Sequence, residues 1–275
     1  MSKPTAEGTV VRSAPAEHPP ASAELSLAGK VVLVTGASTG IGRAIALACG
    51  QAGADVVVTY HTNQAAAEGT AREIRALGRR THVQRADVAD AAAVEKLAAS
   101  ARAAFGRVDV WVNNAGADIL TQAADLSRID KLDRLLSVDL RGTVIASWAA
   151  VELMRQQDTG GVILNMAWDH ILSGGMKGAY AQLFCAAKGG VYSFSRALAR
   201  TVAPHIRVNV LGPGWVETDY GARLDAAARQ RIAESIPLKR WGRPEDVAAA
   251  AVFLACDAAA YITGQMLMIN GGDVL

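Results

Sequence analysis

Three glycines early in the chain have the spacing of a phosphate-binding turn. Gly36, Gly40 and Gly42 lie in the segment Thr-Gly-Ala-Ser-Thr-Gly-Ile-Gly, between the apolar run 31–34 and the alanine-rich segment 43–51. The run has the length and β-branching of a strand buried on both faces, and the second segment suits a helix. Unpaired N–H groups and a positive dipole at the start of such a helix hold a pyrophosphate without a basic side chain. This context predicts a dinucleotide site rather than a plain connecting turn.

A second group of residues could move protons. Asp169 and His170 are adjacent, and a carboxylate can raise the pKa of a neighbouring histidine, so His170 could act as a general acid or base. Against this, adjacent side chains on an extended loop point apart, and such residues are often only solvated. Tyr180 offers a phenol, but Lys188 lies eight residues later, about 12 Å along a helix axis, which is too far to act on that phenol. Tyr180 could meet the substrate directly or could only pack.

The elements that must position these residues alternate strictly between strand and helix. Strands are predicted at 31–34, 55–59, 81–85, 108–112, 162–166 and 206–211, and the main helices at 43–51, 63–77, 91–105, 131–157, 184–203 and 245–256. The alternation predicts an α/β fold with a doubly wound parallel sheet, covered by helices on both faces. Right-handed crossovers then place a ligand at the carboxyl ends of the strands.

The composition fits one such domain. With 275 residues, 51% of them hydrophobic, the chain can bury one substantial core. The net charge of +2 gives no broad electrostatic footprint for nucleic acid, and no apolar run approaches the roughly 20 residues that span a bilayer. Cys49, Cys185 and Cys256 are odd in number and lack metal-ligand spacing, which is typical of core residues in a reducing compartment. We therefore expect a cytoplasmic protein without a metal, a nucleic acid or a membrane as partner.

Residues 1–24 differ in composition from the rest of the chain. They contain four of the eight prolines, mixed with Ala, Ser and Glu, and they lack the apolar region of a secretory signal. We expect a disordered extension over 1–24, followed by a single domain over 25–275. An arm that covers a neighbouring subunit is the alternative.

Several later segments complete a resemblance to the short-chain dehydrogenase/reductase family. They are Asn-Asn-Ala-Gly at 113–116, Ala-Ala-Lys-Gly-Gly at 186–190, Gly-Pro-Gly-Trp-Val-Glu-Thr at 212–218 and the closing segment 261–272. The resemblance is to the 3-oxoacyl-reductase-like branch, and it covers residues 27–272. It implies a Rossmann-like fold and a nicotinamide-dependent oxidoreductase. It also implies a homodimer or homotetramer in which the helical segments 131–157 and 184–203 pair across a two-fold axis.

The resemblance implies a set of cofactor-binding residues around the carboxyl ends of the strands. They are Gly36, Ser38, Thr39, Gly40, Ile41, Gly42, Tyr60, His61, Asp87, Val88, Asn114, Ala115, Gly116, Lys188, Pro213, Gly214, Val216 and Thr218. The second strand ends in Thr-Tyr-His-Thr-Asn at 59–63, without the carboxylate that would repel a ribose 2′-phosphate. This end favours NADP(H) over NAD(H), with Arg43 as a further candidate phosphate partner.

The active site departs from the family pattern. The family uses an Asn, a Ser, a Tyr and a Lys four residues after that Tyr. Here Lys188 is present, but Phe184, Trp168 and Asp139 stand where the Tyr, Ser and Asn would be expected. Trp168 could stack on a planar substrate or narrow the pocket, and Asp139 could form an ion pair with Lys188 or only pack. The candidate catalytic residues are Lys188, Tyr180, His170, Asp169, Asp139, Phe184 and Trp168.

These departures leave more than one function open. Loss of a positioned proton donor costs about 10² to 10⁴ in rate, whereas the alignment for hydride transfer can survive. The first hypothesis is an NADP(H)-dependent oxidoreductase that acts on a carbonyl or hydroxyl of a fairly large, planar small molecule through a non-standard proton relay. The alternatives are a non-redox enzyme of the same fold, for cyclisation, dehydration or isomerisation, and a catalytically inactive nucleotide-binding partner.

Overall fold

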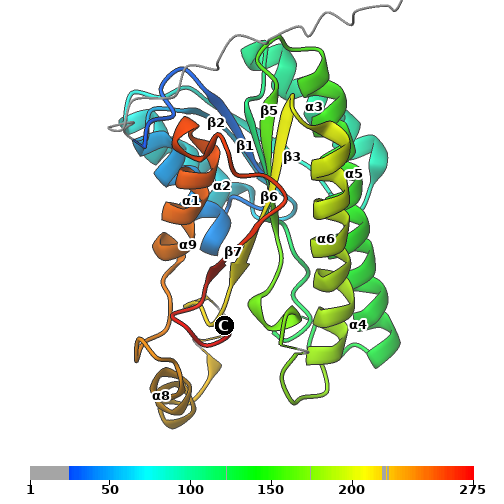
Figure 1. The fold of residues 1–275 in the computed structure, drawn as a ribbon, viewed down its shortest axis with the longest axis vertical. Coiled ribbons are helices and arrows are strands. Elements are labelled where there is room, and N and C mark those ends of the chain that lie inside the picture. The colour runs from blue at the N-terminus through cyan, green and yellow to red at the C-terminus, as the bar shows by residue number, and fades with distance from the viewer. Residues whose placement is uncertain (1–24, 122, 174, 219–220, 222) are drawn as a thin grey trace, which may run out of the picture.

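A parallel β-sheet forms the middle layer of the computed structural model, which describes residues 25–121, 123–173, 175–218, 221 and 223–275. Within these residues the sheet has seven strands in the order β3-β2-β1-β4-β5-β6-β7 (Figure 1). The strands are β1 Val31–Val34, β2 Asp55–Tyr60, β3 Thr81–Arg85, β4 Val110–Asn113, β5 Gly161–Met166, β6 Ile206–Pro213 and β7 Met266–Ile269. The predicted doubly wound sheet is confirmed. The extension expected over 1–24 lies outside the described residues.

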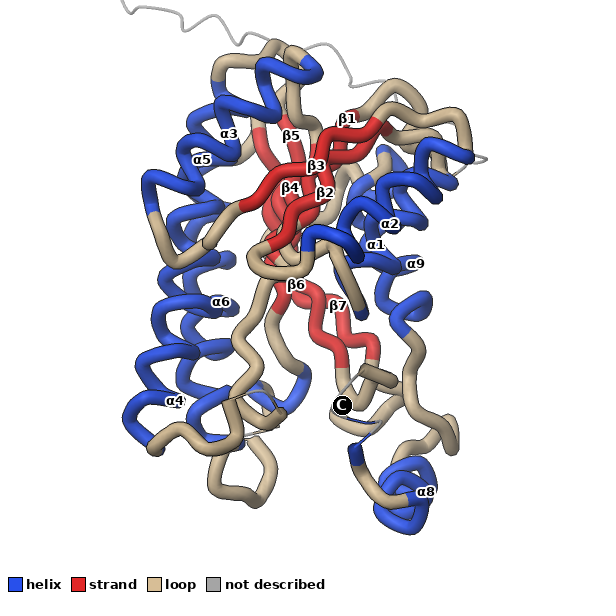
Figure 2. Tube along the Cα trace, turned by 180° about the vertical axis from the view of Figure 1, so that it is seen from behind, coloured by secondary structure: helices blue, strands red, loops and turns tan. Residues whose placement is uncertain are grey.

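Helices cover both faces of the sheet. One face carries α1 Gly40–Gln51, α2 Gln64–Ala76 and α9 Pro244–Ala255, and the other carries α3 Ala91–Phe105, α5 Thr143–Arg155 and α6 Ala181–Val202. Figures 1 and 2 show these two groups from opposite sides. None of the helices in the described part of the chain is both long and apolar enough to cross a membrane.

Strands β1, β2, β4, β5 and β6 each contribute side chains to two apolar cores. In β1, Val32 and Val34 belong to the core beneath α1 and α9, whereas Val31 and Leu33 belong to the core beneath α3, α5 and α6. A strand that is buried on both faces has no polar side to alternate with its apolar side. This is why short uninterrupted apolar runs were sufficient to locate the strands.

The long helix predicted over 131–157 is wrong in detail. The structure has α4 at Arg128–Leu135, a π-helical segment, η1, at Leu136–Gly142, and then α5. A π segment adds one residue to a helical turn and is found most often at functional sites. Here the segment carries Asp139, which is buried, toward the loop that follows β4. The helical period of the sequence could not distinguish this segment from an uninterrupted α-helix.

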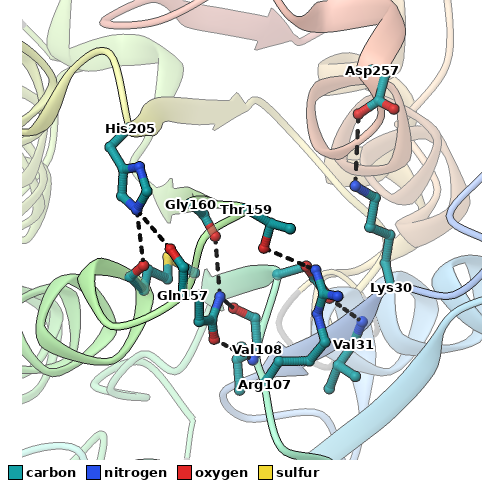
Figure 3. A network of polar contacts seen from close by, with 11 residues as sticks. Lys30, Val31, Arg107, Val108, Gln157, Thr159, Gly160, His205 and Asp257 are labelled. Atoms are coloured by element: carbon teal, nitrogen blue, oxygen red, sulfur yellow. Dashed lines mark hydrogen bonds and ion pairs between the residues drawn. The ribbon is translucent and has the colours of Figure 1, made fainter.

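A polar network connects the segments at the amino ends of the strands (Figure 3). The Gln157 side chain accepts a hydrogen bond from Val108 N at 2.9 Å and donates to the carbonyl oxygens of Val108 and Gly160, each at 3.1 Å. His205 Nε2 lies 2.9 Å from the carbonyl oxygen of Gln157. The network joins the residues that follow α5 to the segments that precede β4, β5 and β6. The amino ends of the strands are therefore a structural support, and their carboxyl ends are available for a ligand.

Candidate active site

The glycine turn has the backbone that a close ligand requires. Gly36 and Gly40 have φ of +64° and +56°, in the left-handed region that a side chain disfavours. A Cβ at Gly42 would collide with the carbonyl oxygen of Gly36 and with the Asn114 amide. That amide donates to the carbonyl oxygens of Thr35 at 3.0 Å and Gly36 at 3.2 Å. Asn114 thus fixes the turn, and α1 begins where the turn ends.

A cavity of about 660 Å³ extends along this turn. Most of the residues predicted to bind the cofactor line it: Gly36, Ser38, Thr39, Ile41, Gly42, His61, Asp87, Val88, Asn114, Ala115, Gly116 and Thr218. Gly40 lines the space next to it, with Thr39 and Thr218. Tyr60 instead packs in the apolar core. The left-handed glycines, the helix start and the size of the cavity fit a dinucleotide.

The part of this cavity that follows β2 and β3 has a mixed charge pattern. His61 Nε2 lies 3.7 Å from Asp87 Oδ2, and Asp87 Oδ1 accepts a hydrogen bond from Ala89 N at 2.9 Å. Arg43, the candidate phosphate partner, donates to both carboxylate oxygens of Glu73 at 2.7 Å. His61 and Arg134 are the basic residues that line the cavity, whereas Arg43 is engaged by Glu73.

Lys188 and Asp139 form the expected ion pair. Lys188 Nζ lies 2.8 Å from Asp139 Oδ2 and donates to the carbonyl oxygen of Met166 at 3.2 Å. Asp139 Oδ1 accepts a hydrogen bond from Ala117 N at 2.8 Å. Both side chains are buried, so each charge depends on the other for its compensation. The π segment is what brings Asp139 to this position.

A second pocket, of about 410 Å³, adjoins the first and shares Ile41 and Thr218 with it. Its walls are largely aromatic: Trp168, Tyr180, Phe184, Trp215 and Trp241. Lys188, Gly214 and Val216 also line it, whereas Pro213 is the last residue of β6. The Trp168 and Phe184 rings meet edge to face with centroids 6.1 Å apart. The Trp215 and Trp241 rings are tilted by 57° with centroids 5.2 Å apart. Sequence reasoning missed Trp241, because it lies in a loop with no motif.

Asp169 and His170 do not lie on an extended loop, and their side chains do not point apart as that alternative would require. Asp169–Ile171 forms a 3₁₀ turn, η2, in which His170 Nδ1 lies 2.7 Å from Asp169 Oδ1. The buried Asp169 also accepts a hydrogen bond from Asn270 Nδ2 at 3.1 Å, and His170 Nε2 lies 3.7 Å from Asp273 Oδ2. The hydrogen bond to Asp169 raises the pKa of His170 against the effect of burial, and the charges of Asp169 and Asp273 add to the rise.

His170 supports the pocket wall. Its ring stacks on Trp168 at 4.8 Å between centroids and 21° between planes, and Trp168 is the residue of this turn that lines the aromatic pocket. The chain Asn270–Asp169–His170–Trp168 therefore links the segment after β7 to the wall of the pocket. This arrangement fixes the indole plane.

Tyr180 lies at the mouth of the same pocket, immediately before α6. Its phenol oxygen accepts a hydrogen bond at 3.2 Å from Lys131 Nζ, which comes from α4. Sequence reasoning missed Lys131, because a lysine on an amphipathic helix is expected to face solvent. The two residues are 49 positions apart, so no local pattern could have paired them.

Comparison with known proteins agrees with this geometry. A family model described as Enoyl-(Acyl carrier protein) reductase matches residues 36–273. L-rhamnose 1-dehydrogenase (NAD(P)(+)) of Sphingomonas sp. is 39% identical over 249 residues, which are 90% of this chain and 96% of that protein. A 3-oxoacyl-acyl-carrier-protein reductase of Synechocystis sp. is 39% identical over 256 residues, which are 91% of this chain and 99% of that protein.

A solved structure shares the whole architecture. It is a blue fluorescent protein from a metagenomic library, in complex with NADPH, with a TM-score of 0.81 and 31% identity. The match covers 91% of this chain and 100% of that chain. The glycine turn, the order of the strands and these similarities lead to one conclusion: the chain belongs to the short-chain dehydrogenase/reductase family.

Proposed function

We propose that the protein is an NADP(H)-dependent oxidoreductase that interconverts a carbonyl and a hydroxyl on a fairly large, planar small molecule. The observation that carries this proposal is the continuity of the two cavities, which share Ile41 and Thr218. One has the glycine backbone of a dinucleotide site, and the other has aromatic walls. A bound nicotinamide supplies or accepts a hydride at the substrate carbon. The protein holds the two molecules together and excludes water between them.

The residues of the chain divide this work. Lys188 and Thr218, which line the aromatic pocket, would hold the ribose and the carboxamide of a bound cofactor. Trp168 and Phe184 present flat surfaces to the substrate ring. Asp139 keeps Lys188 charged and in place, while Asp169 and His170 keep the Trp168 plane fixed.

Tyr180 supplies the proton. Reduction of a carbonyl adds a hydride to carbon and a proton to oxygen, and the phenol of Tyr180 lies at the pocket mouth. His170 is the alternative donor, but its ring is engaged by Asp169 and stacks on Trp168, which itself lines the pocket. The geometry thus favours Tyr180 as the donor and His170 as a positioning residue.

The preference for NADP(H) rests on the end of β2. A hydroxyl, an imidazole and an amide follow Tyr60 there, and His61 lines the cavity. We expect His61→Asp to weaken NADPH binding about tenfold or more, because a carboxylate repels a 2′-phosphate, and to leave NADH binding unchanged or tighter. Arg43→Gln is the control, since Arg43 is already paired with Glu73. Isothermal titration calorimetry with both cofactors measures the effect, and equal weakening by the two variants would contradict this assignment.

The proposed reaction is tested by the absorbance of the reduced nicotinamide. Wild-type protein, with NADPH and a panel of planar aromatic ketones and quinones, should consume the cofactor. Gly42→Ala should abolish cofactor binding, because its Cβ meets the Gly36 carbonyl. Gly69→Ala should not, because there the new Cβ lies 3.7 Å from one arginine side-chain atom. Binding without consumption across the panel would overturn the redox proposal and favour the non-redox alternative.

We also propose that the protein is a cytoplasmic homodimer or homotetramer. The location is supported by three free cysteines, two of them buried. The assembly is supported by Trp148, a large apolar side chain that is exposed on α5.

A further inference from the structure

We propose that Lys131 is a positioning residue for Tyr180. In this role its ammonium holds the phenol at the pocket mouth and stabilises the negative charge that Tyr180 Oη develops as it gives up its proton. The inference rests on the proposed function, in which Tyr180 is the proton donor. In this arrangement the cation beside Tyr180 is Lys131 on α4, whereas Lys188 lies on α6.

The burial of Lys131 is the first observation. Its side chain lies near the start of α4, yet only 2% of the residue is exposed. Lysine is almost never fully buried unless its charge has a partner. If Lys131 had a purely structural role on this amphipathic helix, its ammonium would lie in solvent and keep its hydration. The position of the side chain therefore calls for a partner inside the protein.

The partners of the ammonium are the second observation. Nζ donates to the carbonyl oxygen of Ala124 at 2.5 Å and to Tyr180 Oη at 3.2 Å, and it lies 4.3 Å from the centre of the Tyr180 ring. Among the described residues, the partners of this ammonium are a carbonyl oxygen and a phenol, and both are neutral. The charge of Lys131 is thus solvated by dipoles and by the phenol rather than cancelled by a carboxylate, as the charge of Lys188 is by Asp139.

This arrangement favours negative charge on one atom. A buried cation without an anion stabilises any charge that develops within hydrogen-bond distance, and it does so without reorganisation when it is already in place. When Tyr180 donates its proton to a substrate oxygen, the electron pair of the O–H bond remains on Oη, beside Nζ. Since 37% of Tyr180 is exposed, the proton can be restored from solvent after the product leaves.

Lys188 does not stabilise the phenol in this way. Phe184 lies four residues before Lys188, and the Lys188 ammonium is held by Asp139 Oδ2 at 2.8 Å and by the carbonyl oxygen of Met166 at 3.2 Å. Lys188 and Lys131 therefore have separate partners. Lys188 is paired with Asp139, and Lys131 contacts the phenol of Tyr180.

A double-mutant cycle on turnover tests the coupling. Lys131→Met, which removes the ammonium and keeps most of the length of the side chain, and Tyr180→Phe should each lower kcat about 10²-fold with NADPH and an active carbonyl, and change KM little. The double variant should be no slower than Tyr180→Phe alone, because Lys131 acts through the phenol. Lys131→Arg should recover part of the rate, and Lys96→Met, at an exposed lysine of α3, should match wild type. Additive losses would overturn the inference.

A second measurement needs neither cofactor nor substrate. In protein with ¹³C-labelled tyrosine, the Tyr180 Cζ signal is the one that disappears in Tyr180→Phe. It should shift in Lys131→Met and return toward its wild-type position in Lys131→Arg, with folding checked by thermal melting. An unshifted signal would refute the pairing. If wild-type protein consumes no NADPH, the proposed function fails, and this signal still decides whether Lys131 holds the phenol.

Discussion

At the scale of single residues, the charge of Lys188 is compensated by a carboxylate. Asp139 provides that buried carboxylate at 2.8 Å from the lysine nitrogen, and Phe184, four residues before Lys188, has no hydroxyl to offer. In the proposed reaction the ammonium would hold a sugar hydroxyl of the cofactor, and the proton would come from another residue of the pocket.

The Asp139–Lys188 pair should also be important for stability. We expect Asp139→Ala to lower the free energy of unfolding by about 3 to 5 kcal/mol, because it leaves a buried ammonium without its counter-charge. Urea denaturation followed by circular dichroism measures the loss. Asp158→Ala, at an exposed site after α5, is the control and should differ from wild type by less than about 0.5 kcal/mol. If Asp139→Ala lowered the free energy of unfolding no more than the Asp158→Ala control does, the Asp139–Lys188 pair would be hydrated.

The acid–base behaviour of His170 gives a prediction with a definite sign. Its folded-state pKa is raised, first by the hydrogen bond to Asp169 and then by the charges of Asp169 and Asp273. A raised folded pKa contributes stability that is fully present below the unfolded value of about 6.5 and is lost as the pH rises through the folded value. The difference in free energy of unfolding between wild type and His170→Gln should therefore be larger at about pH 5.5 than at about pH 8.5. Parallel pH profiles in urea denaturation would contradict this assignment.

At the scale of elements, the sequence was informative wherever the signal is local. Runs such as 31–34 are apolar throughout because both sheet faces are covered. These runs predicted the sheet, and the spacing of Gly36, Gly40 and Gly42 after the first run predicted the glycine turn. The π segment escaped prediction because its insertion changes the helical period by a single residue in a stretch that is apolar on one face in either form.

The site depends on contacts that no local pattern encodes. Asp169 and His170 are brought together by a 3₁₀ turn that Asn270, 101 residues later, helps to hold. Lys131 and Tyr180 meet because α4 packs beside the start of α6. In both cases the residue types were visible in the sequence, but their neighbours were decided by tertiary packing. The roles of single side chains were therefore the part that sequence alone left open.

The amino ends of the strands, away from the site, offer a test of whether structural support and cofactor binding are separate. Gln157→Ala removes three hydrogen bonds and leaves the buried Val108 N–H and carbonyl groups without these partners. We expect the free energy of unfolding to fall by about 1 to 3 kcal/mol, while the affinity for NADPH is unchanged below the melting temperature. Thermal melting and calorimetry measure the two effects. Gln156→Ala, at an exposed position, should cost less, and a change in cofactor affinity would show that the two edges are coupled.

At the scale of the whole molecule, the two faces of the sheet differ in what they leave exposed. On the face covered by α3, α5 and α6, Trp148 is 56% exposed and makes an edge contact with Phe194 at 6.4 Å. The indole lines a groove of about 720 Å³ together with apolar side chains such as Ala98, Ile145 and Leu153 and charged ones such as Glu95 and Arg102. A large exposed indole in a groove of this kind marks a surface suited to a second protein copy.

The proposed assembly depends on this surface, so a charge placed there should dissociate it. We expect Trp148→Glu to reduce the molar mass measured by light scattering at least twofold, because a buried carboxylate without a partner would oppose association. Leu77→Glu, at an exposed leucine after α2 on the other face, is the matched control and should keep the wild-type mass. Asp139 lies in η1, which continues into α5, and Lys188 lies on α6, which carries Phe194. Turnover measured on the separated species therefore shows whether assembly also orders the pocket. An unchanged mass in Trp148→Glu would place the interface elsewhere on the molecule, and it would remove the support that α5 now gives to a two-fold assembly.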